Sequence, residues 1–112
     1  MVGGSLLMID NLNEYINLLK KEQYYDAHEI LEEVWFPRRF EENDEVKLLK
    51  GFINASVCFE LHKKGRMEPS KKVWNNYLKY RPLLNNIESE YKEKYFKMAE
   101  FVEGLKEELS KH

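Results

Sequence analysis

The feature that most constrains the fold is the stretch of residues 45–64, which is apolar on nearly every side of a helix. Asn43 or Asp44 can cap its start, and Gly65 stands where helices commonly end. A helix without a polar face must be covered on most sides. We therefore predict a buried central helix. Its apolar residues are Val46, Leu48, Leu49, Phe52, Ile53, Ala55, Val57, Cys58, Phe59 and Leu61.

Periodic apolar residues predict further helices on both sides of the central one. Proline marks two helix ends: Pro37 disfavours helical geometry at Phe36, and Pro82 follows the fourth helix. The sequence leaves open whether residues 82–95 form one helix or two. The expected helix starts are Asp10 or Asn11, Tyr24, Pro69 and a position near Ser89.

These segments predict an all-α fold, a compact bundle of about five helices with a central helix at about 45–64 and a long C-terminal helix. Glycine and proline are scarce, with 5 and 3 residues, and no strand-like alternation is present. A chain of 112 residues suits one domain. We expect residues 10–112 to form a single helical domain and residues 1–9 to be a flexible tail.

Composition argues against several classes of partner. The formal net charge is −2 with both signs interleaved, so we expect no nucleic-acid partner. No segment approaches the ~20 apolar residues that span a bilayer, so we expect no membrane association. The single cysteine, Cys58, excludes an intrachain disulfide and favours a reducing cytoplasm.

A cluster of chemically useful side chains is expected on the second helix. Within the segment YYDAHEILEEVWFPRRF, His28, Glu32 and Trp35 are spaced i, i+4 and i+7, so they lie on one side of the helix. An imidazole and a carboxylate at this spacing can bind one divalent metal or act as acid and base. They can equally form a hydrogen-bonded group that fixes helix packing, because an unsatisfied buried polar group costs ~1–3 kcal/mol.

Other residues can extend this cluster. Tyr24 and Arg38 can line a ligand pocket beside Trp35, and Glu60 is a candidate third group that meets His28. Arg38 can also turn back onto Glu32 or Glu33, hold an anionic ligand or, most commonly, be an ordinary surface arginine. Glu60 can simply meet a lysine or water.

Known catalytic and metal motifs are incomplete in this chain. HEILE lacks the second histidine of HExxH, and no Glu-x-x-His pair is present. Cys58 lies inside an apolar helix, where a thiol is usually inert. We expect no cofactor other than a divalent metal at His28 and Glu32, and the sequence does not decide whether the protein is an enzyme.

The C-terminal segment carries a narrow apolar seam on a charged helix. Such a seam is typical of a helix that packs along a bundle or along a partner. It predicts a protein partner or a homo-oligomer contact at residues 91–109. The seam residues, which recur at steps of four and three, are Tyr91, Tyr95, Met98, Val102, Leu105 and Leu109.

Two segments of the chain, YYDAHEILEEVW and LLKGFINASVCFELHKKG, resemble the family known as domain of unknown function 309. Its signature is similar to H-x-x-x-E-x-x-W, followed by a helix that opens LL-x-G-x-I and closes before a glycine. The resemblance covers roughly residues 15–80. The matching positions are His28, Glu32, Trp35, Leu48, Leu49, Gly51, Ile53 and Gly65.

This resemblance implies an all-α fold of about five helices and supplies no activity, because the family is uncharacterised. Relatives often carry histidine where this chain has Glu60. If that histidine belongs to a site, Glu60 either replaces it as an oxygen ligand or the site is degraded here.

Three functions remain open. We favour a helical interaction or scaffold module, on the strength of the C-terminal seam and the incomplete catalytic set. The alternatives are a metal-dependent, hydrolase-like enzyme that uses His28 and Glu32, and a small-ligand binder with a pocket beside Trp35.

Overall fold

The computed structural model describes residues 4–111, with side chains from residue 8 onward. It confirms the predicted all-α bundle of five helices. The elements in chain order are α1 (Gly4–Lys20), α2 (Tyr24–Trp35), the 3₁₀ turn η1 (Phe36–Arg38), α3 (Asp44–Lys63), α4 (Met67–Tyr80), the 3₁₀ turn η2 (Arg81–Asn85) and α5 (Lys92–Ser110).

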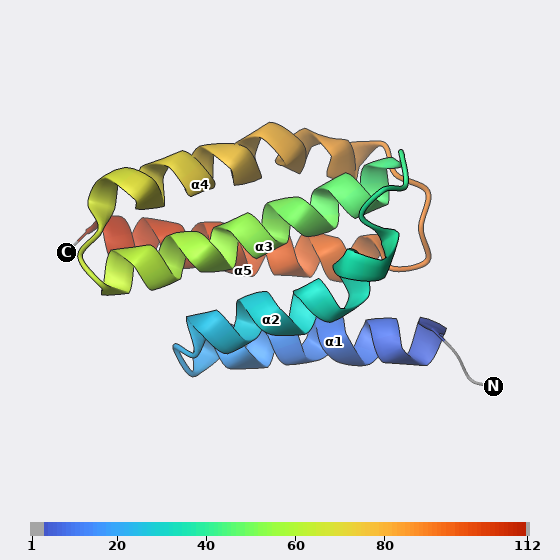
Figure 1. The fold of residues 1–112 in the computed structure, drawn as a ribbon, viewed down its shortest axis with the longest axis horizontal. Coiled ribbons are helices and arrows are strands. Elements are labelled where there is room, and N and C mark those ends of the chain that lie inside the picture. The colour runs from blue at the N-terminus through green and yellow to red at the C-terminus, as the bar shows by residue number, and fades with distance from the viewer. Residues whose placement is uncertain (1–3, 112) are drawn as a thin grey trace.

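Helix α3 occupies the middle of the bundle, as predicted. The α1–α2 hairpin lies on one side of α3, α4 lies on the other, and α5 runs behind it (Figure 1). Leu48, Leu49 and Phe52 of α3 are fully buried, because neighbours cover it from three directions. Among residues 4–111, none of the helices combines the length and hydropathy needed to span a bilayer.

Local signals set both ends of α3. The Asn43 side-chain oxygen accepts a hydrogen bond of 2.9 Å from the Val46 amide and caps the helix start. At the other end Gly65 adopts a positive φ of 76°, and the Arg66 amide donates to the Leu61 carbonyl at 2.8 Å. This is the glycine-terminated end that the sequence predicted.

Helix α1 begins earlier than we predicted. It starts at Gly4 rather than near Asp10, so residues 4–9, expected to be a flexible tail, are helical. The physical reason is that Met8 is buried against the core, and this burial stabilises the helix beyond its expected start. Asn11, expected as a cap, instead donates a hydrogen bond of 2.7 Å to the Ile30 carbonyl of α2. Residues 1–3 of the expected tail lie outside the described residues.

Helices α3 and α4 approach closely at Gly51. A Cβ at this position would lie 3.1 Å from the Tyr80 Cβ, so only glycine fits without displacement. Further along, the Ser70 hydroxyl donates to the Cys58 carbonyl at 3.0 Å. The small residues of α3 therefore serve helix packing.

The C-terminal seam packs inside the bundle. Tyr95, Met98 and Val102 are fully buried, and the remaining seam residues are partly buried. Helix α5 begins at Lys92 rather than near Ser89, because residues 86–91 form an irregular connection after η2. Residues 82–95 are thus a 3₁₀ turn, this connection and the first turn of α5.

Candidate functional site

His28 and Glu32 are brought together as the sequence predicted. The His28 Nε2 lies 3.3 Å from the Glu32 Oε1, and the two side chains are 22% and 38% exposed. The ring of Tyr25 meets His28 edge-on, with centroids 5.6 Å apart. The pair lies at the border between the buried and solvated faces of α2, where water reaches it.

Trp35 faces a different environment from the histidine pair. It packs against the core and carries the Lys50 ammonium 4.4 Å above its ring. Among residues 8–111, no group of three or more His, Cys, Asp or Glu side chains is arranged to hold a metal ion. Protein zinc sites use three or four such ligands. Metal or acid–base chemistry at His28 and Glu32 therefore stays a prediction that rests on two side chains.

Tyr24 and Glu60 do not join this pair. Tyr24 is buried, with its ring centroid 5.7 Å from that of Phe59. Burial raises its pKa, and the nearby negative charges of Glu22 and Glu60 add to the effect. Glu60 forms an ion pair of 3.3 Å with Lys64 one turn later. The plainer interpretation of Glu60, a carboxylate that meets a lysine at the helix end, is the one observed.

Arg38 pairs with a residue that the sequence analysis did not consider. Its guanidinium donates to the Glu41 carboxylate at 3.2–3.3 Å, so its observed partner is neither Glu32 nor Glu33, the two glutamates of α2 that the sequence left open. The Asn43 amide donates to the same carboxylate at 2.9 Å. The hydrogen bond from Arg38 lowers the pKa of Glu41, and the same bond raises the pKa of Arg38. The pairing is local, since Arg38 in η1 and Glu41 are three residues apart in the chain.

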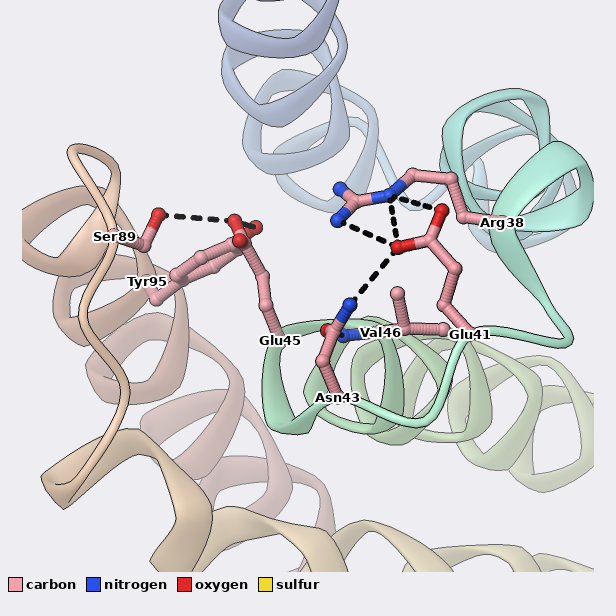
Figure 2. A network of polar contacts seen from close by, with 7 residues as sticks. All are labelled: Arg38, Glu41, Asn43, Glu45, Val46, Ser89 and Tyr95. Carbon is pink, nitrogen blue, oxygen red and sulfur yellow. Dashed lines mark hydrogen bonds and ion pairs between the residues drawn. The ribbon is translucent and has the colours of Figure 1, made fainter.

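A second polar cluster stands beside this one and joins α3 to α5. Glu45 accepts hydrogen bonds from the Tyr95 hydroxyl at 2.6 Å and from the Ser89 hydroxyl at 3.0 Å (Figure 2). The Ser89 oxygen in turn accepts from the Tyr91 amide at 3.1 Å. Burial raises the pKa of Tyr95, and its hydrogen bond to the carboxylate of Glu45 raises it further.

A hollow of about 530 Å³ opens beside these clusters. We call it the acidic hollow, because four carboxylates and only one cation line it. A second hollow, of about 460 Å³, adjoins it and shares Arg38, Glu45 and Glu88. The residues that line the acidic hollow are Met8, Glu33, Val34, Pro37, Arg38, Glu45, Glu88, Ser89, Glu90 and Tyr91.

The expected pocket beside Trp35 and the acidic hollow are different places. Arg38 lines the hollow, whereas Tyr24, His28 and Trp35 do not. Tyr24 begins α2 and Arg38 lies in η1, beyond the other end of α2, so at about 1.5 Å per residue they are roughly 20 Å apart. The four residues that we grouped around one ligand are therefore not brought together.

The segment that borders the hollow also presents exposed aromatic rings. We call residues 36–40 the aromatic loop. The Arg39 guanidinium lies 3.5 Å from the Phe36 ring centroid and 4.5 Å from that of Phe40. Phe36 and Phe40 are 54% and 84% exposed, which is unusual for phenylalanine. Arg38 stood out in the sequence and the rings of this loop did not, because no periodicity distinguishes them from core residues.

No curated protein and no solved structure gives a significant match. The family model described as domain of unknown function (DUF309) matches residues 12–73, more than half of the chain. The match includes the lining residues of the hollow that come from α2, η1 and α3, and leaves out Met8 of α1 and residues 88–91. The chain therefore belongs to the DUF309 family.

Proposed function

We propose that the protein is a helical interaction module that binds a partner protein through the acidic hollow and the aromatic loop. The observation that carries this proposal is that the aromatic loop both lines the hollow and exposes an aromatic ring. Pro37 and Arg38 line the hollow, while Phe40 on the same loop projects into solvent. A partner seated in the hollow would therefore contact the exposed rings as well.

The charges of the hollow favour a basic group. Glu33, Glu45, Glu88 and Glu90 line it, and the one cation, Arg38, already pairs with Glu41. A cation in the hollow would gain attraction from several carboxylates, whereas an anion would be repelled.

The apolar part of the lining narrows the choice further. Met8, Val34 and Pro37 offer a surface against which an aliphatic stem can pack. Lysine and arginine combine such a stem with a charged head. The volume of about 530 Å³ lies within the ~300–1,000 Å³ typical of ligand pockets. We therefore propose that the partner inserts a lysine or arginine side chain.

The aromatic loop supplies the rest of the contact. Phenylalanine, tryptophan and arginine are enriched in protein interfaces, and arginine is common among the residues that contribute most binding energy. The Arg39 guanidinium lies over the rings of both Phe36 and Phe40, and these contacts favour one arrangement of the three side chains before a partner arrives. This ordering lowers the entropy cost of binding.

A displayed peptide library, selected on the immobilised protein, tests this function. We expect the selected peptides to share a basic residue and to bind the Phe40→Ala and Glu88→Lys variants at least about tenfold more weakly. Phe96→Ala is the matched control, because Phe96 is 39% exposed on α5 and lines neither hollow. Peptides without basic residues, or equal binding to all variants, would overturn the proposal.

A small organic cation is the second candidate, favoured by the same acidic lining and apolar surface. A linear diamine or triamine would place an amine near Glu45 or Glu88 and its methylene chain along Val34. Nuclear magnetic resonance titration with spermidine tests this. Saturable shifts at residues 88–91 that are lost in Glu88→Lys would support it, and shifts spread evenly over surface carboxylates would refute it.

Two further predictions from the sequence, an enzymatic activity and a cytoplasmic location, remain proposals. The hydrolase-like enzyme is supported by the 3.3 Å pairing of His28 with Glu32. A cytoplasmic location is supported by the single cysteine, Cys58, whose thiol is free and buried.

A further inference from the structure

A second surface, separate from the acidic hollow, lies between α1 and α5. It is a groove of about 660 Å³ with apolar contributions from Ile16, Phe101, Gly104 and Leu105. Most of the predicted C-terminal seam points into the bundle, so this groove uses a neighbouring face of α5. It shares no residue with the lining of the acidic hollow.

Gly104 has no explanation within the described chain. It stands in the interior of α5, where glycine destabilises a helix relative to alanine. Gly51 is required because Tyr80 lies against it, and Gly65 is required because its φ is positive. A Cβ at Gly104 would meet no atom within 4 Å. The missing side chain therefore leaves a notch on the outer surface of α5.

The rim of the groove carries balanced charges. Lys20 and Lys97 are positive, and Glu100 and Glu108 are negative. A partner of one sign would satisfy half of these groups and be repelled by the other half. A surface with the same balanced pattern would satisfy both, and a second copy of this chain carries such a surface.

We propose that a second copy of the chain covers this groove, with the two α5 helices antiparallel about a two-fold axis midway between Phe101 and Gly104. Residues equally far from the axis then face one another, and each contact occurs twice. Phe101 lies against the partner subunit's Gly104, and its ring fills the notch. Lys97 faces the partner subunit's Glu108, which forms two ion pairs per dimer.

This arrangement gives each unusual feature of the groove a counterpart. Phe101 is a large, partly exposed ring, and Gly104 leaves open space on the same face that can receive it. The i, i+3 and i+4 spacing of the six groove residues on α5 places them on one side of the helix. The opposite charges at the two ends, Lys97 and Glu108, fix the antiparallel direction, because parallel helices would oppose like charges.

Sedimentation equilibrium of the full chain over a range of concentrations tests the proposal. We expect the mass to rise from 13.5 kDa toward twice that value. Gly104→Ala should weaken the dimer at least severalfold and yet raise the melting temperature of the dilute monomer. That combination separates an interface effect from a folding defect.

Reversing the charges of Lys97 and Glu108 gives a more specific test of the dimer. Lys97→Glu and Glu108→Lys should each weaken the dimer, and the double variant should restore it, because the pairs re-form with reversed polarity. The two residues are three turns apart on one helix, so an intrachain ion pair cannot explain rescue. Lys72→Glu, on the exposed face of α4, is the control and should have no effect. A wild-type mass that stays at 13.5 kDa, or a dimer indifferent to all these variants, would overturn the proposal.

Discussion

Tyr95 on α5 donates a hydrogen bond of 2.6 Å to Glu45 on α3, and this bond ties the last helix to the first turn of the central one. The two residues are 50 positions apart in the chain. Because Ser89 donates to the same carboxylate oxygen, Glu45 also anchors the connection whose residues 88–91 line the acidic hollow. The contact joins helix packing and the proposed binding site in one cluster.

Removal of the Tyr95 hydroxyl should therefore destabilise the fold. We expect Tyr95→Phe to lower the free energy of unfolding by about 1.5–3 kcal/mol, the range for a hydrogen bond to a charged group. Urea unfolding followed by circular dichroism measures the change. Tyr25→Phe is the control and should have no effect, since Tyr25 is 55% exposed. A Tyr95→Phe midpoint equal to that of the wild type would contradict the role assigned to this bond.

The buried tyrosines predict a loss of stability at alkaline pH. Burial raises the pKa values of Tyr15, Tyr77 and Tyr95 above the ordinary value of about 10. Above that pH the unfolded chain releases phenolic protons that the folded chain retains. The unfolded state then binds fewer protons, so the free energy of unfolding falls as pH rises above about 10 and is unaffected by these groups below it.

Urea midpoints measured from about pH 8 to about pH 11 test this dependence. Lysines titrate in the same range, so the informative quantity is the difference between wild type and Tyr95→Phe. The variant has one fewer tyrosine with a raised pKa, so its free energy of unfolding should fall less steeply as pH rises. Parallel curves for the two proteins would show that Tyr95 does not contribute.

The His28–Glu32 pair should contribute little to stability. Both side chains are partly exposed, so we expect His28→Ala to cost less than about 1 kcal/mol. Trp35→Ala should cost more, about 2–4 kcal/mol, because that ring packs against the core. Chemical denaturation of the two variants checks this order, and a larger loss at His28 would indicate that the pair is structural.

Thermal melts with added divalent metals test whether His28 and Glu32 form a metal site. If His28 and Glu32 bind a divalent cation, added Zn²⁺, Mn²⁺ or Ni²⁺ should raise the melting temperature of the wild type and not that of His28→Ala. Metal analysis of the purified protein should then find stoichiometric metal that the variant lacks. Identical melts with and without each metal would remove the metal-dependent enzyme from the candidates.

Replacing two glycines by alanine should change the free energy of unfolding in opposite directions. Gly51→Ala should lower the free energy of unfolding by about 1 kcal/mol or more, because the new Cβ crowds Tyr80 at 3.1 Å. Gly104→Ala should raise it by about 1 kcal/mol in the monomer, because the new methyl group meets nothing and alanine favours the helix. Thermal melts at low protein concentration measure both changes, and equal signs would refute the packing described for one of the two sites.

The sequence by itself determined the helices and the central place of α3. Asn43, Pro37 and Gly65 act within a few residues of their own position, so their effects could be predicted without a tertiary structure. The pairing of His28 with Glu32 was predictable for the same reason, since one helical turn joins them. The start of α1 was missed, because the residue that extends it, Met8, is stabilised by burial rather than by a local signal.

Only the tertiary structure decided where a binding site can form. Glu33, Glu45 and Glu88 come from three segments that are far apart in the chain, and no spacing rule links them. Helix periodicity identified the apolar seam of α5 without showing that its own bundle would cover most of it. Local rules act over a few residues, whereas a hollow or an exposed groove depends on how whole helices pack against one another.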